Sequence, residues 1–579
     1  MSYPVKVKYL LTFIVCLTLL SFCINTSAFI VNTFLQYFLF TFIAIFICVA
    51  GLIAGIKSPF KFSVIEILFF LWAIYIVGHT LFIQNGEYYQ LSYLLSGICL
   101  CVMLSCLFRS GDVDYMSLYR LFAYVGFVQS VICILQYTQV ISSSSKFYPV
   151  MGTFNNPNIT AMFIVASIPY FLQNIHLRKN IKVHAILLVF MLLALVLLKC
   201  RTAYVGLAVI MIVFFSANKE IRKWYKSLRL RRKLSLAIVL IVLFVLNVGG
   251  FYYFKKDSAD GRFFVWKITT RMIEDKPLTG YGYGLFEKEY NLYQAKYFNQ
   301  NTTFTQEHKN ARYVYMPYSD LFEQAVQGGI FGFLFYLMLH IVIIIKAFKS
   351  KDVLLTSIIL SILVMGSINF SQQAIPLWLL LLISVAYLSS KETVFLIENK
   401  AIRYTIAMII IIIAVPFTII QSQKIKAHIS FFAIKKEKNI DSQLKHFHHL
   451  ADDIGYYEPF HSAYANTLWK SGDKVGAIRE LVKASEISSS PDLFTQLALY
   501  YFQQGETEKA TKLLLTVKNM VPAYFNPRLM LMDIYSAAGQ YDKERNIALD
   551  VMQLPFSNDN KDAIKCRKQA QTILNRKPF

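Results

Sequence analysis

The chain has 579 residues, 56% of them hydrophobic, and a mean hydropathy of +0.48. Soluble globular proteins rarely reach such hydropathy, and long apolar runs recur up to about position 420, so we expect a polytopic membrane protein with a soluble tail. The formal net charge of +24 lies largely in short basic connectors, densest at 222–233. This placement fits the positive-inside rule and argues against nucleic-acid binding.

The apolar runs predict about 13 membrane-spanning helices, each long enough, or nearly so, to cross about 30 Å of hydrocarbon. We expect them at 9–26, 33–55, 64–84, 92–108, 118–137, 158–175, 184–199, 202–217, 235–254, 328–346, 353–370, 375–389 and 404–421. Basic residues fall on alternate connectors, which predicts a cytoplasmic amino terminus. An odd number of crossings then places the loop 255–327 and the carboxy-terminal tail outside the cytoplasm. Residues 1–28 also fit a cleaved signal peptide, which would leave the later orientation unchanged.

Two short polar segments interrupt the first half of the membrane region. Residues 152–158 read Gly-Thr-Phe-Asn-Asn-Pro-Asn, a composition that predicts a tight turn with exposed amide groups. A simple helix cap by Asn158 is the alternative. Lys199 and Arg201 lie in a very short outer connector, against the positive-inside bias, so they favour an anionic partner. Interfacial snorkelling is the alternative for Lys199.

The loop 255–327 is polar, aromatic and far longer than a simple helix connection, which is typical of functional loops. Arg262 and Trp266 open it, and an ordinary solvated arginine is the alternative for Arg262. A glycine-rich stretch follows at 276–286, and the loop closes on Gln-Gly-Gly at 327–329.

The tail after Gln421 has the composition of a helical repeat domain. Gly472, Gly505 and Gly539 recur at about 34 residues, the tetratricopeptide period. We expect a linker at 422–455 and a tetratricopeptide-like solenoid at 456–579, with a concave surface suited to protein partners. An irregular helical bundle is the alternative. Paired Cys or His residues at structural-zinc spacing do not occur in the sequence, and we expect neither metal nor cofactor.

The motifs between about 150 and 340 together resemble the superfamily of O-antigen ligases and polymerases, bacterial envelope glycosyltransferases. The Gly-Thr-Phe-Asn-Asn-Pro-Asn segment resembles its signature before a central helix, and Arg201 and Arg262 match its arginines. The tail resembles the branch containing protein O-oligosaccharyltransferases. The resemblance implies transfer of a glycan from a polyprenyl diphosphate carrier to an acceptor hydroxyl, without metal or nucleotide sugar.

The resemblance also assigns roles to residues. Arg201 and Arg262 would bind the diphosphate, with Lys199 as a helper. Further substrate contacts are expected from Asn155, Asn156, Asn158, Trp266, Gly282 and Gly284.

The acceptor hydroxyl calls for a base, and here the sequence departs from the family. Tyr318 stands at the position of the family's histidine and Gln327 at that of its glutamate. Tyrosine, with an ordinary pKa near 10, is a poor base but can orient a hydroxyl. Asp320, Glu323 or His308 are alternatives, so Tyr318 and Asp320 complete the predicted catalytic set.

We therefore expect an all-α enzyme of the bacterial inner membrane, with a glycosyltransferase domain at 1–421 whose catalytic loop faces the periplasm. Its acceptor would be a protein Ser or Thr or a lipid-core sugar, and the repeats would bind a protein partner. Chain polymerisation is the alternative within the enzyme class. A transporter would need ionisable groups buried in several spans, where the sequence offers only Glu66, His79 and Arg120. A repeat-based scaffold would leave the loop motifs without a purpose.

Overall fold

The computed structural model describes residues 32–57, 59–83, 88–111, 113–145, 147–154, 156–219, 223, 225, 227–229, 231, 256–301, 305–554 and 561–576. The predicted spans 9–26 and 235–254, the possible signal peptide at 1–28 and the residue Asn155 lie outside them, as does most of the basic cluster at 222–233.

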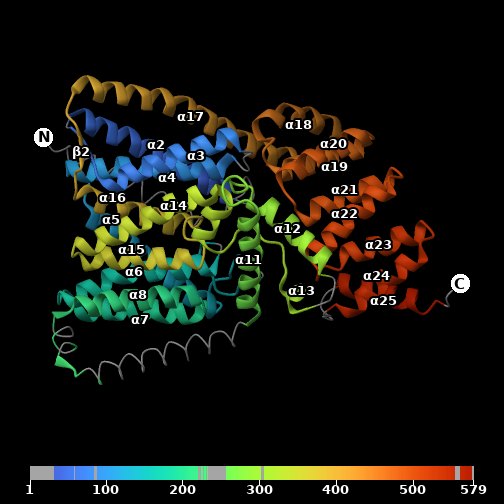
Figure 1. Cartoon of the computed structure of the whole chain (residues 1–579), viewed down its shortest axis with the longest axis horizontal. Coiled ribbons are helices and arrows are strands. Elements are labelled where there is room, and N and C mark those ends of the chain that lie inside the picture. The colour runs from blue at the N-terminus through green and yellow to red at the C-terminus, as the bar shows by residue number, and fades with distance from the viewer. Residues whose placement is uncertain are drawn as a thin grey trace.

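The first part of the chain forms a bundle of apolar helices, coloured blue to yellow in Figure 1. Eight helices in the described part are long and apolar enough to cross a membrane. They comprise α2 (Asn32–Lys57), α3 (Val64–Phe82), α4 (Tyr88–Ser110), α5 (Tyr115–Tyr137), α6 (Pro157–His176), α7 (Ile181–Leu198), α14 (Asp320–Lys349) and α17 (Lys400–Ile434). Three shorter apolar helices accompany them, namely α8 (Arg201–Ala217), α15 (Val353–Ser367) and α16 (Ile375–Ser390). The all-α, multi-pass prediction is confirmed, whereas the total of about 13 spans remains a prediction.

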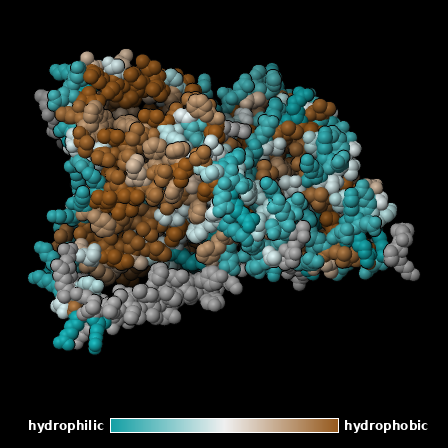
Figure 2. All heavy atoms as spheres, viewed as in Figure 1, coloured by the Kyte–Doolittle hydropathy of each residue, from teal (hydrophilic) through white to brown (hydrophobic). Residues whose placement is uncertain are grey.

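Burial sorts these helices into inner and outer positions. α16 is buried along nearly its whole length, and α6 along most of its own. Both are apolar all round, as helices surrounded by other helices must be. α7 is also apolar all round but mostly exposed, so it presents an outward face to lipid. Figure 2 shows the continuous apolar surface of the bundle beside the more polar remainder.

A short two-stranded sheet marks the end of the bundle farthest from the soluble part (Figure 1). β1 (Phe60–Phe62) pairs antiparallel with β2 (Phe395–Ile397), with Lys61 opposite Leu396. Lys346 and Lys391 form ion pairs with Glu392 and Asp352 beside this sheet. Lys61, Lys346 and Lys391, from three of the predicted basic connectors, therefore lie at the same end of the bundle, as the positive-inside rule predicts.

A buried ion pair lies at this end, between the start of α3 and the end of α4. Both guanidinium nitrogens Nη1 and Nη2 of Arg109 donate to the two carboxylate oxygens of Glu66 at 2.8 Å. Glu66 also completes the cap of α3, because Ser63 N donates to its Oε2 at 2.5 Å. This ionisable residue, noted in the sequence, thus serves to join two helices.

Replacing Glu66 with alanine is expected to lower the free energy of unfolding by about 3–5 kcal/mol, because Arg109 would stay buried without its partner. Thermal unfolding of the purified protein in detergent measures the loss. Glu398→Ala, at an exposed position near β2, is the matched control and should change stability little. Equal melting temperatures for both variants would contradict this role of the pair.

The long loop contains three helices, α11 (Lys256–Asp275), α12 (Phe286–Gln300) and α13 (Gln306–Asn310). Its glycine-rich stretch 277–284 lies along α14 at a kink, where Gly329 has φ 62° and ψ −165°. Backbone groups join the two segments: Tyr281 N donates to Val326 O at 2.8 Å, Gly282 N to Gln327 O at 3.0 Å, and Ile330 N to Pro277 O at 2.8 Å. The closing glycines therefore allow close approach of two backbones.

The tail folds into helix hairpins, coloured orange to red in Figure 1. They are α19 (Glu458–Ser471) with α20 (Lys474–Ile487), α21 (Pro491–Gln503) with α22 (Thr507–Met520), and α23 (Asn526–Ala537) with α24 (Tyr541–Gln553), followed by α25 (Lys561–Leu574). Gly472, Gly505 and Gly539 lie between the paired helices with φ of 99°, 81° and 67°. Left-handed φ at these turns explains the period of the glycines. The repeat-solenoid prediction is confirmed.

The segment 422–455, predicted as a linker, is largely helical. α17 continues to Ile434, and α18 (Ile440–Ile454) packs with it and α19 around Phe431, Phe447 and Phe460. α17 thus connects the sheet end of the bundle with the repeats (Figure 1).

The repeats hold the loop helix α12. Leu292 and Ala295 of α12 share a hydrophobic core with repeat residues including Leu481 and Val517. Gln294 Nε2, fully buried, donates to Met520 O at 2.5 Å. The loop and the repeats therefore form one packed unit at the end of the bundle opposite the sheet.

Candidate functional site

An open cavity of about 670 Å³ lies where the loop meets the ends of several bundle helices. It is lined by Tyr137, Tyr148, Pro149, Val150, Pro157, Asn158, Val196, Leu197, Leu198, Lys199, Arg201, Thr202 and Arg262. Three of these lining residues are cations, and none is an Asp or a Glu. Four of the residues predicted to bind or transform substrate, Asn158, Lys199, Arg201 and Arg262, thus share one cavity.

The connector between α7 and α8 brings two of the cations to the rim. α7 ends at Leu198, and Lys199 caps it with φ 49°, its N–H donating to Leu195 O at 3.2 Å. Because α8 begins at Arg201, the chain reverses within two residues. Left-handed backbone at a residue other than glycine is uncommon, and such strain is found disproportionately at functional sites.

Arg262 projects from the loop helix α11 into the same cavity. Its Nη1 donates to Ile368 O at 3.3 Å, and its guanidinium lies 5.3 Å from the ring centre of Tyr318. Burial lowers the pKa of Arg262, and the positive charge of nearby Arg201 lowers it further. An arginine remains charged despite such a shift, so the two guanidinium groups keep a strongly positive potential here.

Pro157 and Asn158 line the cavity, and residues 151–153 shortly before them are fixed by α5. Met151 N and Gly152 N both donate to Gln136 Oε1 at 2.9 Å, and Thr153 N donates to Gln129 Oε1 at 3.0 Å. Gly152 has φ 65°, and a Cβ there would lie 2.6 Å from Gln129 Oε1.

Two asparagines of the segment 152–158 have different positions at the start of α6. Asn156, not Asn158, is the N-cap of α6, and its side chain accepts from Asn158 N at 2.8 Å. Asn158, held by that bond, lines the cavity. The cap predicted as the alternative is therefore present, but Asn156 supplies it and not Asn158.

Tyr318 contacts the guanidinium of Arg262, and Trp266 fixes the helix α11 that carries Arg262. Neither residue lines the cavity. Tyr318 has φ 53°, and burial raises the pKa of its hydroxyl, although Arg262 opposes the shift. Its hydroxyl is therefore protonated at neutral pH. Trp266 lies one turn after Arg262 on α11, and its Nε1 donates to Pro317 O at 2.9 Å, fixing the helix to the segment that carries Tyr318.

The carboxylate of Asp320 accepts hydrogen bonds from backbone N–H groups and from a hydroxyl. Its Oδ2 accepts from Ser371 Oγ at 2.5 Å, from Ser371 N at 3.2 Å and from Gln372 N at 3.2 Å. It is 2% exposed. These bonds make Asp320 the anchor of the connector between α15 and α16.

That connector, residues 368–374, joins the parts of the site. Ile368 accepts from Arg262, and Asn369 Nδ2 donates to Thr202 Oγ1 at 3.3 Å, beside Arg201. Phe370 packs against Tyr318 with ring centres 6.1 Å apart. The connector thus contacts both arginine-bearing helices and the Tyr318 segment.

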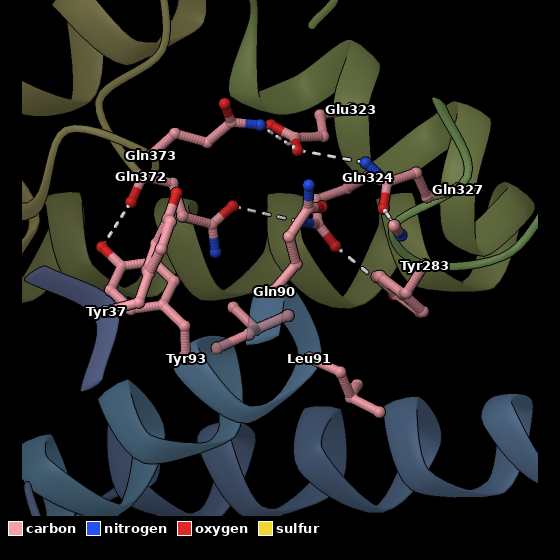
Figure 3. Close-up of a pocket in the computed structure, with 12 residues that line it drawn as sticks. Tyr37, Gln90, Leu91, Tyr93, Tyr283, Glu323, Gln324, Gln327, Gln372 and Gln373 are labelled. Atoms are coloured by element: carbon pink, nitrogen blue, oxygen red, sulfur yellow. Dashed lines mark hydrogen bonds between the residues drawn. The ribbon is translucent and has the colours of Figure 1, made fainter. Parts of the chain in front are cut away.

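Beyond the connector lies a second, small cavity of about 40 Å³, shown in Figure 3. Glu323 Oε1 accepts from Gln373 Nε2 at 2.6 Å and from Gln327 Nε2 at 3.1 Å. Gln324 Nε2 donates to Gln372 Oε1 at 3.2 Å on the same side of α14. Glu323 is therefore enclosed by amides, in a space for about one water molecule.

The remaining predicted residues lie away from the cationic cavity. Gly282 and Gly284 hold the loop on α14, with Gly284 N donating to Gln327 Oε1 at 2.8 Å, and Gly284 also lines the small cavity. The His308 ring lies inside the loop, with its centre 4.3 Å from the ring centre of Phe298. Burial there lowers the pKa of His308. Gly282, Gly284 and His308 are not among the residues lining the cationic cavity.

Sequence reasoning missed Gln129, Gln136 and the connector 368–374. The two glutamines are seven residues apart on the largely apolar α5, a spacing that places them on one helix face. The polar run Asn369 to Gln373 between two apolar runs was a comparable signal.

Comparison with known proteins found one family that matches this part of the sequence. Residues 186–337 match the family model of the O-antigen ligases. The matched region runs from α7 to α14 and includes Lys199, Arg201, Arg262, Tyr318 and Asp320. The resemblance inferred from the sequence motifs is thus confirmed there, and it supports a membrane glycosyltransferase-like function for the chain.

No curated protein matches the sequence. Among solved structures, the chain is similar to one described as the crystal structure of an APC/C hetero-tetramer, Cut9-Hcn1. The identity is 10%, with 82% of this chain and 76% of that chain covered, and the TM-score is 0.20.

Proposed function

We propose that the protein transfers a glycan from a polyprenyl diphosphate carrier to a hydroxyl group of an acceptor, on the extracytoplasmic side of the bacterial inner membrane. The observation that carries this proposal is the meeting of Lys199, Arg201 and Arg262 in one open cavity whose described lining residues include no carboxylate. The match to the O-antigen ligases supports glycan chemistry at this place.

The arginines act on the leaving group. The bond between the anomeric carbon and the diphosphate oxygen breaks, the acceptor oxygen bonds to that carbon, and the hydroxyl proton passes to water in the open cavity. Negative charge grows on the diphosphate as it leaves. Arg201 and Arg262 bind it through charge-assisted contacts, which lowers the barrier because the charges are already in place. Lys199 adds a third positive charge at the rim.

The walls of the cavity suit a lipid-linked donor. Val196, Leu197 and Leu198 of α7 line it, so its apolar side continues onto a membrane helix. On that helix, Val189 and Val196 are 62% and 60% exposed. A polyprenyl chain lying along the outward face of α7 would bring its diphosphate to Lys199 and Arg201.

Tyr318 and Asp320 are assigned to positioning. Tyr318 supports the guanidinium of Arg262, and Asp320 fixes the connector whose Ile368 carbonyl accepts from the same arginine. The diphosphate is a good leaving group, so charge stabilisation and orientation of the acceptor are the main catalytic contributions.

Tyr318→Phe is expected to keep kcat/KM within about threefold of the native value, because the ring remains over Arg262, whereas Tyr318→Ala loses about tenfold. The two variants would be compared by transfer from a synthetic polyprenyl diphosphate glycan, as a function of pH. Unchanged pH profiles are expected for Tyr318→Phe, since the hydroxyl is not the base. Equal inactivity of both variants would show that the hydroxyl itself is required.

A genetic experiment tests the proposed function. The encoding gene is deleted, glycoproteins and glycolipids are profiled separately, and the intact chain is reintroduced. Glycan lost from proteins or from a lipid core, and restored by the intact chain, is the expected result. Shortened carrier-linked chains would instead indicate a polymerase, and unchanged profiles would refute glycan transfer. The packing of the repeats against the catalytic loop favours an acceptor other than the carrier.

A further inference from the structure

A groove of about 930 Å³ runs between the loop helix α12 and the repeat helices α22 to α24. It is larger than the cationic cavity and lies near the upper end of the range for ligand sites, about 300–1,000 Å³. One wall belongs to the loop and the other to the repeats. A segment of polypeptide chain several residues long would fit such a space.

The charges lining the groove are mostly positive. Lys296 of α12, Lys512 of α22 and Lys543 of α24 line it from both walls, and Glu508 is the single acidic residue among the described lining residues. All three lysines are exposed. Lysines facing one another across a concave surface attract anionic groups and repel cationic ones.

The other lining residues suit a peptide backbone. Thr511, Thr516 and Asn519 offer hydrogen-bonding groups, while Leu292 and Leu515 offer small apolar contacts. A mixture of this kind recognises an extended chain with polar and acidic side chains. It lacks the apolar seam that an amphipathic helix needs for binding.

The groove is connected to the helix that carries Arg262 through a shared hydrophobic core. Phe264 and Ile268 of α11 share a buried core with Phe286 and Tyr290 of α12. The repeat wall is fixed to α12 in turn, since Gln294 Nε2 of α12 donates to Met520 O, at the end of α22, at 2.5 Å. A chain held in the groove is therefore held in a fixed relation to the helix that carries Arg262.

We propose that this groove binds an extended acidic segment of the acceptor polypeptide, an inference that rests on glycan transfer to an acceptor other than the carrier. Binding there would raise the effective concentration of the acceptor hydroxyl at the cationic cavity. Part of the specificity for the acceptor would then come from a segment remote from the modified residue.

The test measures peptide binding directly on the full chain purified in detergent. A short fluorescein-labelled peptide of alternating Glu and Ser is titrated, beside a peptide of alternating Lys and Ser, with fluorescence anisotropy as the signal. We expect only the acidic peptide to bind, and to bind more weakly at high salt. Replacing Lys296, Lys512 and Lys543 with Glu should weaken binding by about tenfold or more.

The matched control replaces three exposed lysines of α25, Lys561, Lys565 and Lys568, with Glu, giving the same change in net charge outside the groove. This control should bind the acidic peptide nearly as the native chain does. Equal binding by the groove variant and the native chain, equal loss in the control, or equal binding of both peptides would overturn the proposal.

Binding of a polyprenyl diphosphate glycan, measured in parallel, separates this inference from the proposed function. The groove variant should retain carrier binding, whereas Arg262→Ala should lose it and keep peptide binding. A native chain that binds the acidic peptide through these lysines but neither binds the carrier nor transfers glycan would refute the proposed function and leave the groove as an acidic-peptide site. A chain that transfers glycan without binding the peptide would refute the groove.

Discussion

Replacing Arg262 with alanine is expected to lower kcat/KM for glycan transfer by about 10²–10³-fold, the size of the effect of removing one preorganised charge-stabilising group. The side chain lines the cationic cavity, is held by Ile368 O and Tyr318, and is the only one of the three cations supplied by the loop. Transfer from a synthetic polyprenyl diphosphate glycan to an acceptor, followed by chromatography, measures the loss.

Two further variants make this result specific. Arg271→Ala removes an arginine of the same helix that lies over Tyr297, 4.9 Å from its ring centre and outside the cavity, and should leave transfer nearly unchanged. Arg262→Lys keeps the charge but loses the forked geometry, so an intermediate rate is expected. Native kcat/KM in Arg262→Ala would exclude the diphosphate role assigned to this cavity.

Gly329→Ala is expected to destabilise the chain by about 3 kcal/mol or more, because its backbone conformation is essentially restricted to glycine. A Cβ at this position would lie 2.2 Å from Leu278 O and 2.5 Å from Leu278 C, in a backbone that cannot move aside without releasing the loop. The melting temperature in detergent and hydrogen exchange of residues 277–284 would both report the change.

Gly78→Ala is the matched control, since Gly78 lies within the helix α3 and a Cβ there would meet nothing within 4 Å. That variant should be neutral or slightly stabilising, by about 0.5–1 kcal/mol, because alanine favours helix. If Gly329→Ala melted like Gly78→Ala, the close backbone approach at the kink would not be required for stability.

The regular elements were predictable because their signals are local. Hydropathy alone locates the eleven apolar helices seen in the described residues, and the period of the repeat glycines locates the hairpin turns. Charge asymmetry between connectors predicts which helix ends share one side of the membrane, and that assignment stays a prediction. These patterns depend on residues near one another in the chain.

The site was predictable only in part, because its geometry depends on contacts between distant segments. Lys199, Arg201 and Arg262 could be singled out by their chemistry, but their meeting in one cavity required the fold. Asp320 was expected near the chemistry, whereas its bonds to Ser371 and Gln372 depend on a connector fifty residues away. Hydrogen bonds at such separation leave no periodic pattern in a sequence.

The repeats illustrate the same limit. Their helices follow from the sequence, and their concave face was expected to await a partner. The sequence did not predict that the repeats also pack against α12, through Ala295, Gln294 and the partly buried carboxylate of Glu287, which accepts from Ser489 N at 3.3 Å. The composition of α12 does not indicate that this helix packs against the repeats.

The packing of α12 against the repeats has a consequence for the order in which contacts form during synthesis. Gln294 finds its acceptor at Met520, and Glu287 its donors at Ser488 and Ser489, all of which leave the ribosome long after the loop does. At about 5–20 residues per second, the interval from Gln294 to Met520 is about 10–45 s. During that time the loop groups that later contact the repeats remain hydrated. The loop therefore reaches its final packing only after the repeats have been synthesised, and chains that stop before Met520 lack these contacts.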